Sequence, residues 1–430
     1  MRLNVLTLAA VTGVAVAAYA HAARADDDRQ DGTTATTAPV QTLQGLLNDG
    51  YNTYISGNIG SSGSAYTSDS QGAIAAGGDV YLQNFGASTN TTAGGVGLAV
   101  GGSLTMTNGS VNGTTDVGGS LAAASTGFGN VNVGGSMSYL NGQINGNVNV
   151  DGSASITAAG VNGSVGVGGA LSVVNAAKPD LQAASAYVAP INFAATSANV
   201  SAVSNYLAAQ QTTAGDTFGK NAQGAYVFNS TVAGDNVFNV TQAQLTAMSG
   251  NQVLFNSTVA GATDIINVQG GGTVALPSNM SFGYTGAMTD NNVLLNLNGA
   301  TTVNAASNVS YDLSILAPNA TVVTTGGNIT GSLFAANLVG NAQLNQSNAG
   351  GGFDGALPGS SLLSATSSLA PAPAPLPLLG SSPLGMLVLA GFGRGRLRRL
   401  ARSYARVAIR TGNGPALSSI SVVMGERTTV

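Results

Sequence analysis

Residues 100–174 read VGGSLTMTNGSVNGTTDVGGSLAAASTGFGNVNVGGSMSYLNGQINGNVNVDGSASITAAGVNGSVGVGGALSVV, and this stretch decides the fold. Paired glycines begin at residues 101, 118, 134 and 168, and Asp151-Gly152 takes the corresponding place once, so the spacings are 17, 16, 17 and 17. This period is too short for helical repeats and is typical of one turn of a β-helix. The alternative, a low-complexity linker, would not keep apolar residues in register.

Apolar residues within each unit share one parity, so in a strand they point to one side. Coils stacked about 4.8 Å apart would turn them into continuous interior ladders. The predicted inward positions are Val100, Gly102, Leu104, Val117, Gly119, Leu121, Val133, Gly135, Met137, Val150, Gly152, Val167, Gly169 and Leu171. The second glycine of each pair indicates a bend or a close backbone approach at a corner. The sequence therefore predicts an all-β, right-handed parallel β-helix with coils of about 17 residues, whose ends need caps.

The repeat stops after Asn175, and residues 190–211 carry apolar side chains at helical spacing, which predicts a short helical insert against the solenoid. Strands then resume, and the heptapeptide FNSTVAG occurs at 228–234 and again at 255–261. Further alternating runs follow at 237–240, 265–268, 293–297, 313–316, 321–323 and 332–338. We expect more coils of the same architecture, in one solenoid domain over residues 44–358.

The N-terminus has the pattern of an export signal. Arg2 precedes an apolar stretch, and Ala23-Arg24-Ala25 supplies a cleavage site, so residues 1–25 are predicted to be a signal peptide. An N-terminal membrane anchor is the alternative, although the stretch is short for a span. The mature chain would begin near Asp26, with a flexible segment over residues 26–43.

The C-terminal part changes composition three times. Residues 359–377 form a Ser/Ala/Pro-rich spacer, residues 378–393 a short hydrophobic segment, and residues 394–430 an arginine-rich tail expected on the cytoplasmic side. The candidate sorting or anchor residues are Pro373, Pro375, Pro377, Arg394, Arg396, Arg398 and Arg399. This arrangement resembles the PEP-CTERM class of bacterial sorting signals, which implies recognition in the membrane by sorting machinery. Removal of the segment, its retention, and a basic helix lying on anionic lipid remain alternatives.

Composition excludes several kinds of chemistry. The chain has no Cys and no Trp, and its single histidine, His21, lies in the predicted signal peptide. No Cys or His zinc site and no Ser/His/Asp triad can form in the mature chain, and no cofactor is predicted. Residues 26–370 carry three cations against sixteen aspartates, which argues against nucleic-acid binding, whereas the part from Pro371 onward has eight arginines and one glutamate.

Two segments of the predicted solenoid resemble the choice-of-anchor A family of bacterial surface proteins. The first runs from Tyr51-Asn52-Thr53-Tyr54 through Ser68-Asp69 to Ala75-Ala76-Gly77-Gly78. The second contains Ser314-Ile315-Leu316-Ala317-Pro318-Asn319-Ala320 and then Gly327-Asn328-Ile329-Thr330-Gly331-Ser332. The resemblance implies a surface-displayed adhesin or matrix protein that carries one of several interchangeable anchors.

These observations together predict an exported, surface-associated, non-enzymatic adhesin-like or matrix protein, with an extracellular polysaccharide or a cell-surface ligand as its partner. The first alternative is a polysaccharide-active or polysaccharide-binding β-helix protein. For an active one, stacked coils would bring together carboxylates such as Asp79, Asp116 or Asp151. The second alternative is a solenoid face that orders water or ice. A calcium site at Asp and Asn turns is a weaker hypothesis, since no EF-hand loop is present.

Overall fold

The computed structural model describes residues 42–90, 95–177, 179–307, 309–348, 350–355 and 357. The predicted signal peptide, most of the N-terminal segment, the spacer, the hydrophobic segment and the arginine-rich tail lie outside these residues, as do all the sorting residues from Pro373 to Arg399. Within the described part of the chain, no helix has both the length and the apolar character needed to cross a membrane.

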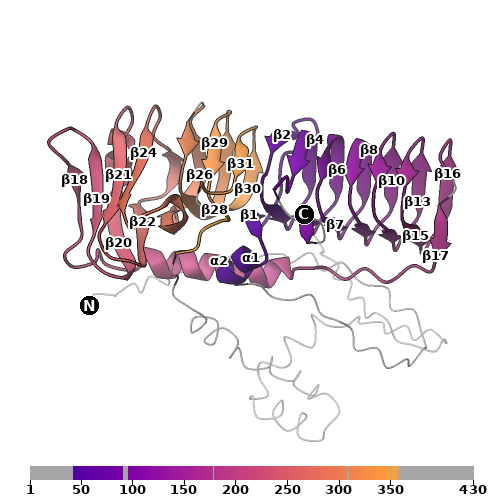
Figure 1. Cartoon of the computed structure of the whole chain (residues 1–430), viewed down its shortest axis with the longest axis horizontal. Coiled ribbons are helices and arrows are strands. Elements are labelled where there is room, and N and C mark those ends of the chain that lie inside the picture. The colour runs from indigo at the N-terminus through magenta and orange to yellow at the C-terminus, as the bar shows by residue number, and fades with distance from the viewer. Residues whose placement is uncertain are drawn as a thin grey trace, which may run out of the picture. The chain divides into compact units, whose positions relative to one another are not determined.

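The described residues form a β-solenoid, which confirms the predicted fold class (Figure 1). Nearly all strand pairs are parallel, and each coil visits three faces in turn, which we call A, B and C. A residue with positive φ marks the corner between faces B and C in successive coils, namely Asn84, Asn108, Ser125, Asn141, Ala158 and Asn175. Asparagine tolerates this left-handed conformation better than most residues, which suits it to a repeated corner.

The strands are grouped here by face. Face A contains β1 (Tyr51–Ile55), β3 (Ala73–Ala76), β5 (Val96–Val100), β7 (Thr114–Val117), β9 (Val131–Val133), β12 (Val148–Val150), β15 (Ser164–Val167), β17 (Asp180–Gln182), β20 (Gly234–Thr241), β22 (Ala262–Gln269), β25 (Val293–Asn296) and the first parts of β28 (Ser314–Thr324) and β30 (Leu333–Val339). Face B contains β10 (Met137–Leu140), β13 (Ala154–Thr157), β16 (Leu171–Val174), β23 (Gly272–Ala275), β26 (Ala300–Ala305) and the last parts of β28 and β30. Faces B and C share β4 (Val80–Ala87), β6 (Leu104–Val111) and β8 (Leu121–Phe128).

Face C also contains β2 (Tyr66–Asp69), β11 (Gln143–Ile144), β14 (Gly160–Val161), β18 (Thr217–Lys220), β19 (Tyr226–Ser230), β21 (Gln252–Ser257), β24 (Ser281–Gly286), β27 (Ser310–Tyr311), β29 (Asn328–Thr330) and β31 (Gln343–Asn345). The helices are α1 (Leu43–Asn48), α2 (Phe193–Ala208), α3 (Gln242–Ala247) and the 3-10 helix η1 (Asp290–Asn292).

The coils do not stack in sequence order. Strand β1 lies in the middle of the solenoid, between β3 and β30. From β1 the chain coils outward to β17, and we call residues 51–182 the N-arm. It then returns along face A through residues 183–192, which we call the strap, and through α2 (Figure 1). The C-arm, residues 217–345, begins at the opposite end and coils back to β30. The C-arm supplies further coils after the helical insert, and they stack on the other side of β1.

The valine and leucine positions of the predicted ladder are buried in the inner coils of the N-arm, whereas Gly169 is exposed. Val100, Val117, Val133 and Val150 have no exposed surface, and Leu104, Leu121 and Met137 are at most 3% exposed. Val167 and Leu171 are only partly buried, because they belong to the last coils of the N-arm and have fewer neighbouring coils to cover them.

The second glycine of each pair leaves room for the coil beneath it. A Cβ atom at Gly119 would lie 2.8 Å from the backbone carbonyl of Gly102, and one at Gly135 would lie 2.6 Å from the Gly119 oxygen. Such distances are too short for any side chain. The Gly102, Gly152 and Gly169 positions are equally crowded by the backbone of the preceding coil, so the close approach recurs along the arm.

The exception to the glycine pair, Asp151, has a structural role. Both of its carboxylate oxygens accept a hydrogen bond from the Tyr187 N–H at 3.0 Å, and Asn149 exchanges two hydrogen bonds with the backbone of Ser185. These two side chains tie the strap to the outside of face A. A carboxylate therefore replaces glycine in the one coil where the strap needs an acceptor.

Helix α2 is docked on the C-arm by a buried asparagine ladder. Asn296 donates to Asn267 Oδ1 at 2.9 Å, and Asn267 donates to Asn239 Oδ1 at 3.3 Å. The remaining amide hydrogens reach the last turns of the helix, since Asn296 donates to the Ser204 carbonyl and Asn267 to the Leu207 carbonyl. The asparagines thus supply hydrogen-bond donors to buried carbonyls near the end of the helix, which holds the helix along face A.

Candidate functional site

Face B carries a continuous column of small polar side chains across both arms. From the C-arm end to the N-arm end it consists of Thr273, Thr302, Thr321, Asn337, Asn58, Asp79, Ser103, Ser120, Ser136, Ser153 and Ala170. The inward neighbours of these residues, such as Val274, Val303 and Val80, are buried, so the column itself faces outward. Each serine of the column directly follows a glycine pair or Asp151-Gly152 in the sequence, whereas Thr302 and Thr321 of the C-arm follow no glycine pair.

Each member from Asn337 to Ser153 fixes the next coil. The Asn337 side-chain oxygen accepts from the Asn58 N–H at 2.9 Å, and the Asp79 carboxylate accepts from the Ser103 N–H at 2.8 Å. The hydroxyl oxygens of Ser103, Ser120, Ser136 and Ser153 accept in the same way from the following coil at 3.1 to 3.3 Å. Each serine hydroxyl still has its own hydrogen free to donate to solvent or to a ligand.

The rest of face B is nearly uncharged. The next outward column runs Ala275, Asn304, Val323, Val339, Gly60, Tyr81, Thr105, Ala122, Ser138, Ser155 and Ser172. A third, in the N-arm alone, runs Gln83, Thr107, Ala124, Leu140, Thr157 and Val174. Among the described residues of these columns, Asp79 is the single charged one, so face B offers hydroxyl, amide and methyl groups at the coil spacing.

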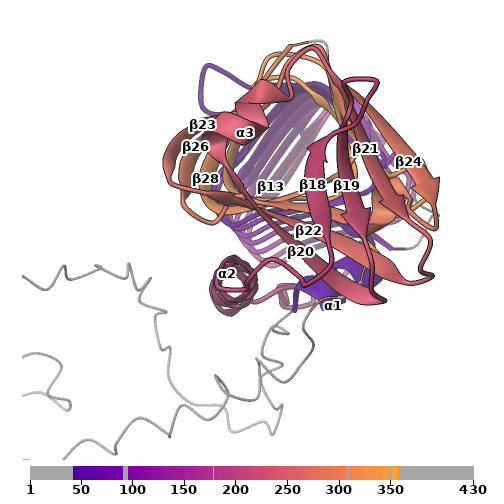
Figure 2. The ribbon, with the colours of Figure 1, turned by 90° about the vertical axis from the view of Figure 1, so that its left-hand side faces the viewer.

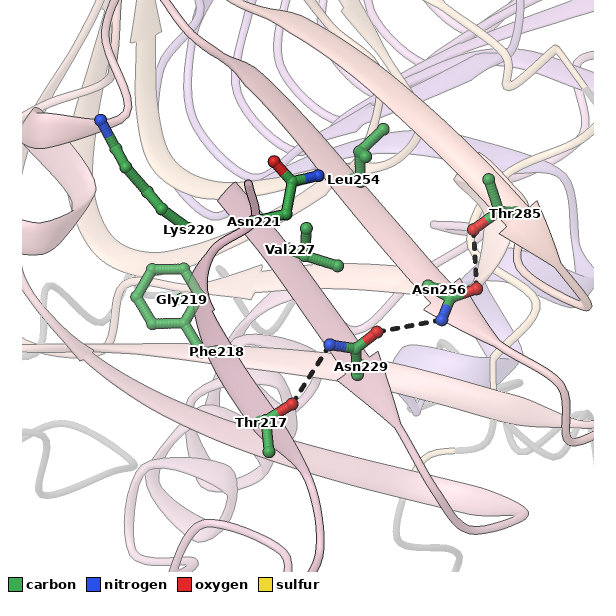
Figure 3. A pocket seen from close by; sticks show the side chains of 10 residues that line it. All are labelled: Thr217, Phe218, Gly219, Lys220, Asn221, Val227, Asn229, Leu254, Asn256 and Thr285. Atoms are coloured by element: carbon green, nitrogen blue, oxygen red, sulfur yellow. Dashed lines mark hydrogen bonds between the residues drawn. The ribbon is translucent and has the colours of Figure 1, made fainter. Parts of the chain in front are cut away.

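A second candidate surface lies on face C of the C-arm, where β18, β19, β21 and β24 form a shallow hollow of about 430 Å³ that we call the amide trough (Figure 3). Its lining residues are Thr217, Phe218, Gly219, Lys220, Asn221, Val227, Asn229, Leu254, Asn256 and Thr285. Four of these side chains form one hydrogen-bonded row across the strands, as Figure 3 shows.

All the hydrogen bonds in the row point the same way, from β24 toward β18. The Thr285 hydroxyl donates to Asn256 Oδ1 at 2.8 Å, Asn256 donates to Asn229 Oδ1 at 2.9 Å, and Asn229 donates to the Thr217 hydroxyl at 3.1 Å. Each amide thus keeps one N–H and one oxygen lone pair unused within the row. The Thr217 hydroxyl hydrogen is the last of the chain and is also available. The row can therefore donate to a ligand and accept from it at each strand.

Beside the polar row runs an apolar strip. Val227 and Leu254 are half-buried on the outer side of β19 and β21, with Gly219 on one flank and Gly283 on the other. The glycines keep the strip accessible, since nothing lies within 4 Å of a Cβ atom built at Gly219. A strip of aliphatic carbon beside paired donors and acceptors suits the amphipathic ring of a sugar.

The trough also contains the one cation that the structure describes. Lys220 lies at the edge of the trough and is exposed. By alternation along β18 its side chain shares the side of Phe218, opposite to the polar row, and its ammonium group is 4.7 Å from the centre of the Tyr226 ring (Figure 3). The described residues contain twelve aspartates in addition to this single lysine. Among the described residues, the single cation thus lies close to the trough, and its field favours a ligand with negative charge without direct contact with the polar row.

The trough rests on a rigid floor of stacked aromatic rings. Phe218 stacks on Phe228 with ring centres 4.4 Å apart, Phe228 on Phe255 at 5.2 Å, and Phe255 on Tyr284 at 5.5 Å. These rings are packed beneath the strands and keep the strands in fixed positions. The side chains of the polar row are therefore positioned by strands and not by a loop.

Inside the C-arm, β22 places a carboxyl group in the core. Asp264 has no exposed surface, and it accepts a hydrogen bond from the Ser230 hydroxyl. Burial raises the pKa of Asp264 to about 7, and the negative charge of Asp216 adds to this effect. The parity of β22 points Asp264 away from both candidate surfaces, so its role is structural.

The aspartates considered for catalysis are engaged separately. Asp79 accepts from Ser103, Asp151 accepts from Tyr187, and Asp116 accepts from the Asn132 amide at 2.8 Å. Burial raises the pKa of Asp116, which lies under the strap on face A. Within the described ranges, no group of three or more acidic or histidine side chains could hold a metal ion.

A parallel β-solenoid with broad, open and polar outer faces is the class of protein that the fold and these surfaces define. The chain belongs to the pAdhesive_15 family, described as an ice-binding-like adhesive domain, which matches residues 45–346. Among solved structures, it is similar to an ice-binding protein from an Antarctic bacterium of the Flavobacteriaceae, with 10% identity and a TM-score of 0.22 over 72% of this chain and 98% of that one. No curated protein matches the chain.

Proposed function

We propose that the protein is an exported, non-enzymatic surface adhesin that attaches to an extracellular polysaccharide through the amide trough. The observation that carries this proposal is the hydrogen-bonded row of Asn229 and Asn256, which lies open beside an aliphatic strip. Membership of an adhesive family supports the same reading. The positive charge of the exposed Lys220, which lies close to the trough on the other side of β18, favours a polysaccharide that contains uronic acids over a neutral one.

Replacing both Asn229 and Asn256 by alanine is expected to weaken binding to an immobilised uronate polymer by about tenfold or more, because each amide supplies two hydrogen bonds to the ligand. Lys220→Ala should weaken binding to the uronate polymer and leave binding to a neutral glucan unchanged. Biolayer interferometry of the purified chain on alginate and on dextran measures both effects.

The matched control is the pair Thr105→Ala and Ser138→Ala, which removes two hydroxyls from face B and leaves the trough intact. Its affinity for both polymers should equal that of the wild type. Equal affinities for the trough variant and the wild type would exclude the trough as the attachment site. Turnover of either polymer would contradict the non-enzymatic assignment.

Face B favours a second candidate function, the ordering of water or ice. Its outward columns repeat at the coil spacing of about 4.8 Å, and hydroxyls occupy most positions from Thr273 to Ser153. If face B orders ice, the purified chain should show thermal hysteresis, and Ser120→Lys with Ser136→Lys should abolish it by adding bulk and charge. An absence of hysteresis in the wild-type chain would leave only the adhesive reading.

The sorting prediction becomes part of this proposal. We infer that the chain carries a choice-of-anchor A type domain, and that residues 378–430 deliver it to the membrane or to sorting machinery. The segments concerned, residues 1–25 and 359–430, flank the family match. The intact mass of the protein recovered from cells checks both ends, and a mass equal to that of the full 430 residues would refute processing.

A further inference from the structure

The far end of the C-arm is covered on all three faces (Figure 2). On face B, α3 takes the place of a strand, buries Leu245 and is held by a hydrogen bond from Gln242 to the Gly271 carbonyl. On face C, β18 pairs antiparallel with β19. On face A, Thr213 donates to the Val237 carbonyl and accepts from its N–H, so residues 210–213 cover the edge of β20.

The far end of the N-arm has none of these covers among the residues that the structure describes. Strand β16 pairs with β13 on one side only, and it ends the sheet of face B. The carbonyls of Ala170 and Val174 accept from β13, so by alternation the N–H and C=O groups of Leu171 and Val173 point to the open edge. Such an edge is a template for another strand.

Apolar side chains gather at the same end. Val174 on β16 is 46% exposed and Leu181 on β17 is 56% exposed, the latter being the most exposed large hydrophobic side chain in the described chain. The interior residues Leu171 and Val167 are only partly buried there. A solenoid end that leaves its core layer and its strand edge uncovered at once is a docking surface.

We propose that this end docks a second copy of the chain, end to end, through β16. An open coil end presents one strand edge on each of its three faces. A second open coil end presents the same three edges and can therefore pair with it. Because the C-arm end is closed, the matching surface is the N-arm end of the copy. The contact is thus isologous, with a two-fold axis through face B.

Charge supports this orientation. Asp180 is the single charged side chain described in residues 164–182, and it lies on face A. A two-fold axis through face B brings face A of one copy against face C of the other, so the two Asp180 carboxylates do not meet. The proposal goes beyond polysaccharide binding and does not depend on it, since the trough lies on the opposite arm.

The hydrogen-bonding pattern predicts the register. Leu171 and Val173, whose backbone groups point outward, pair with Val173 and Leu171 of the copy. Ser172 then faces Ser172 of the copy across the axis, in a pair without mutual hydrogen bonds, where Cα atoms approach to about 4.5 Å. That separation lies within the range of a disulfide.

Since the chain has no cysteine, Ser172→Cys would carry its single thiol. Mild oxidation of the full-length variant is expected to yield a covalent dimer on a non-reducing gel. Ser138→Cys is the matched control, because Ser138 is also an exposed serine of the same face B column, two coils further from the end. It should stay monomeric under the same conditions.

A second measurement is independent of crosslinking. Sedimentation of the wild-type chain should show a concentration-dependent dimer, and Val174→Lys with Leu181→Lys should raise its dissociation constant by tenfold or more through like-charge repulsion. Both side chains are exposed, so the fold should persist, which circular dichroism checks. Crosslinking of Ser138→Cys as fast as Ser172→Cys, or a dimer unaffected by the two lysines, would overturn the proposal.

Discussion

Gly119→Ala is expected to lower the free energy of unfolding by about 3 kcal/mol, although it adds one methyl group. The new Cβ atom would lie 2.6 Å from Ser103 Oγ and 2.8 Å from the carbonyl group of Gly102. The Gly102 carbonyl cannot retreat without breaking the hydrogen bond that it accepts from the Gly119 N–H at 2.8 Å. The two coils must therefore separate at this corner. Urea-induced unfolding followed by circular dichroism measures the loss.

Gly127→Ala is the control for this prediction. Gly127 lies in the same coil, and a Cβ atom there would meet its nearest neighbour, Ser110 Cβ, at 3.6 Å, an ordinary contact. Its free energy of unfolding should stay within about 1 kcal/mol of the wild type, because the lost flexibility of the unfolded chain offsets small packing changes. A similar effect of both substitutions would mean that coil spacing at the glycine pair is not the cause.

The second large effect concerns pH. The pKa of Asp264 rises from its usual 3.8 to about 7 on folding, so the folded protein binds this proton more tightly than the unfolded chain does. The contribution of the Asp264 proton to the free energy of unfolding is complete below about pH 4, and it is lost as the pH rises through 7. The rise in pKa corresponds to about 4 kcal/mol, which is the expected loss from this group between pH 4 and pH 8.

Asp264→Asn should remove that part of the pH dependence, since the amide does not ionise in this range and can still accept from the Ser230 hydroxyl. The wild type and the variant should have similar stability at pH 4, and the variant should be the more stable at pH 8. Burial also raises the pKa of Asp116 and Asp235, so the variant retains some slope. Asp354→Asn, at an exposed position, is the control. Identical pH profiles for the wild type and Asp264→Asn would refute this account.

The sequence predicts the N-arm well because its coils are local and nearly constant in length. A valine before each glycine pair and an apolar residue after it suffice to assign the inward parity. The role of Asp151 could not be found this way, because its partner, Tyr187, belongs to a strap that crosses face A from outside the repeat.

The candidate surfaces were not predicted because their members come from coils of unequal length. Asn229 and Asn256 lie 27 residues apart, whereas Asn256 and Thr285 lie 29 apart, so no fixed period connects them. The repeated FNSTVAG heptapeptide was the available signal, since it contains both asparagines. The face B column could not be predicted for another reason. Asn58 and Asn337 become neighbours only when the two arms meet.

The central position of β1 has a consequence for the order of folding. The N-arm needs only contacts between successive coils, so it can form as soon as residues 51–182 are available. The other edge of β1 is completed by Leu333, Phe334 and Ala335, which are separated from it by most of the chain. Closing so long a loop is slow compared with stacking adjacent coils. The junction of the two arms is therefore the last step of folding, and until then the chain exposes the edge of β1 to other strands.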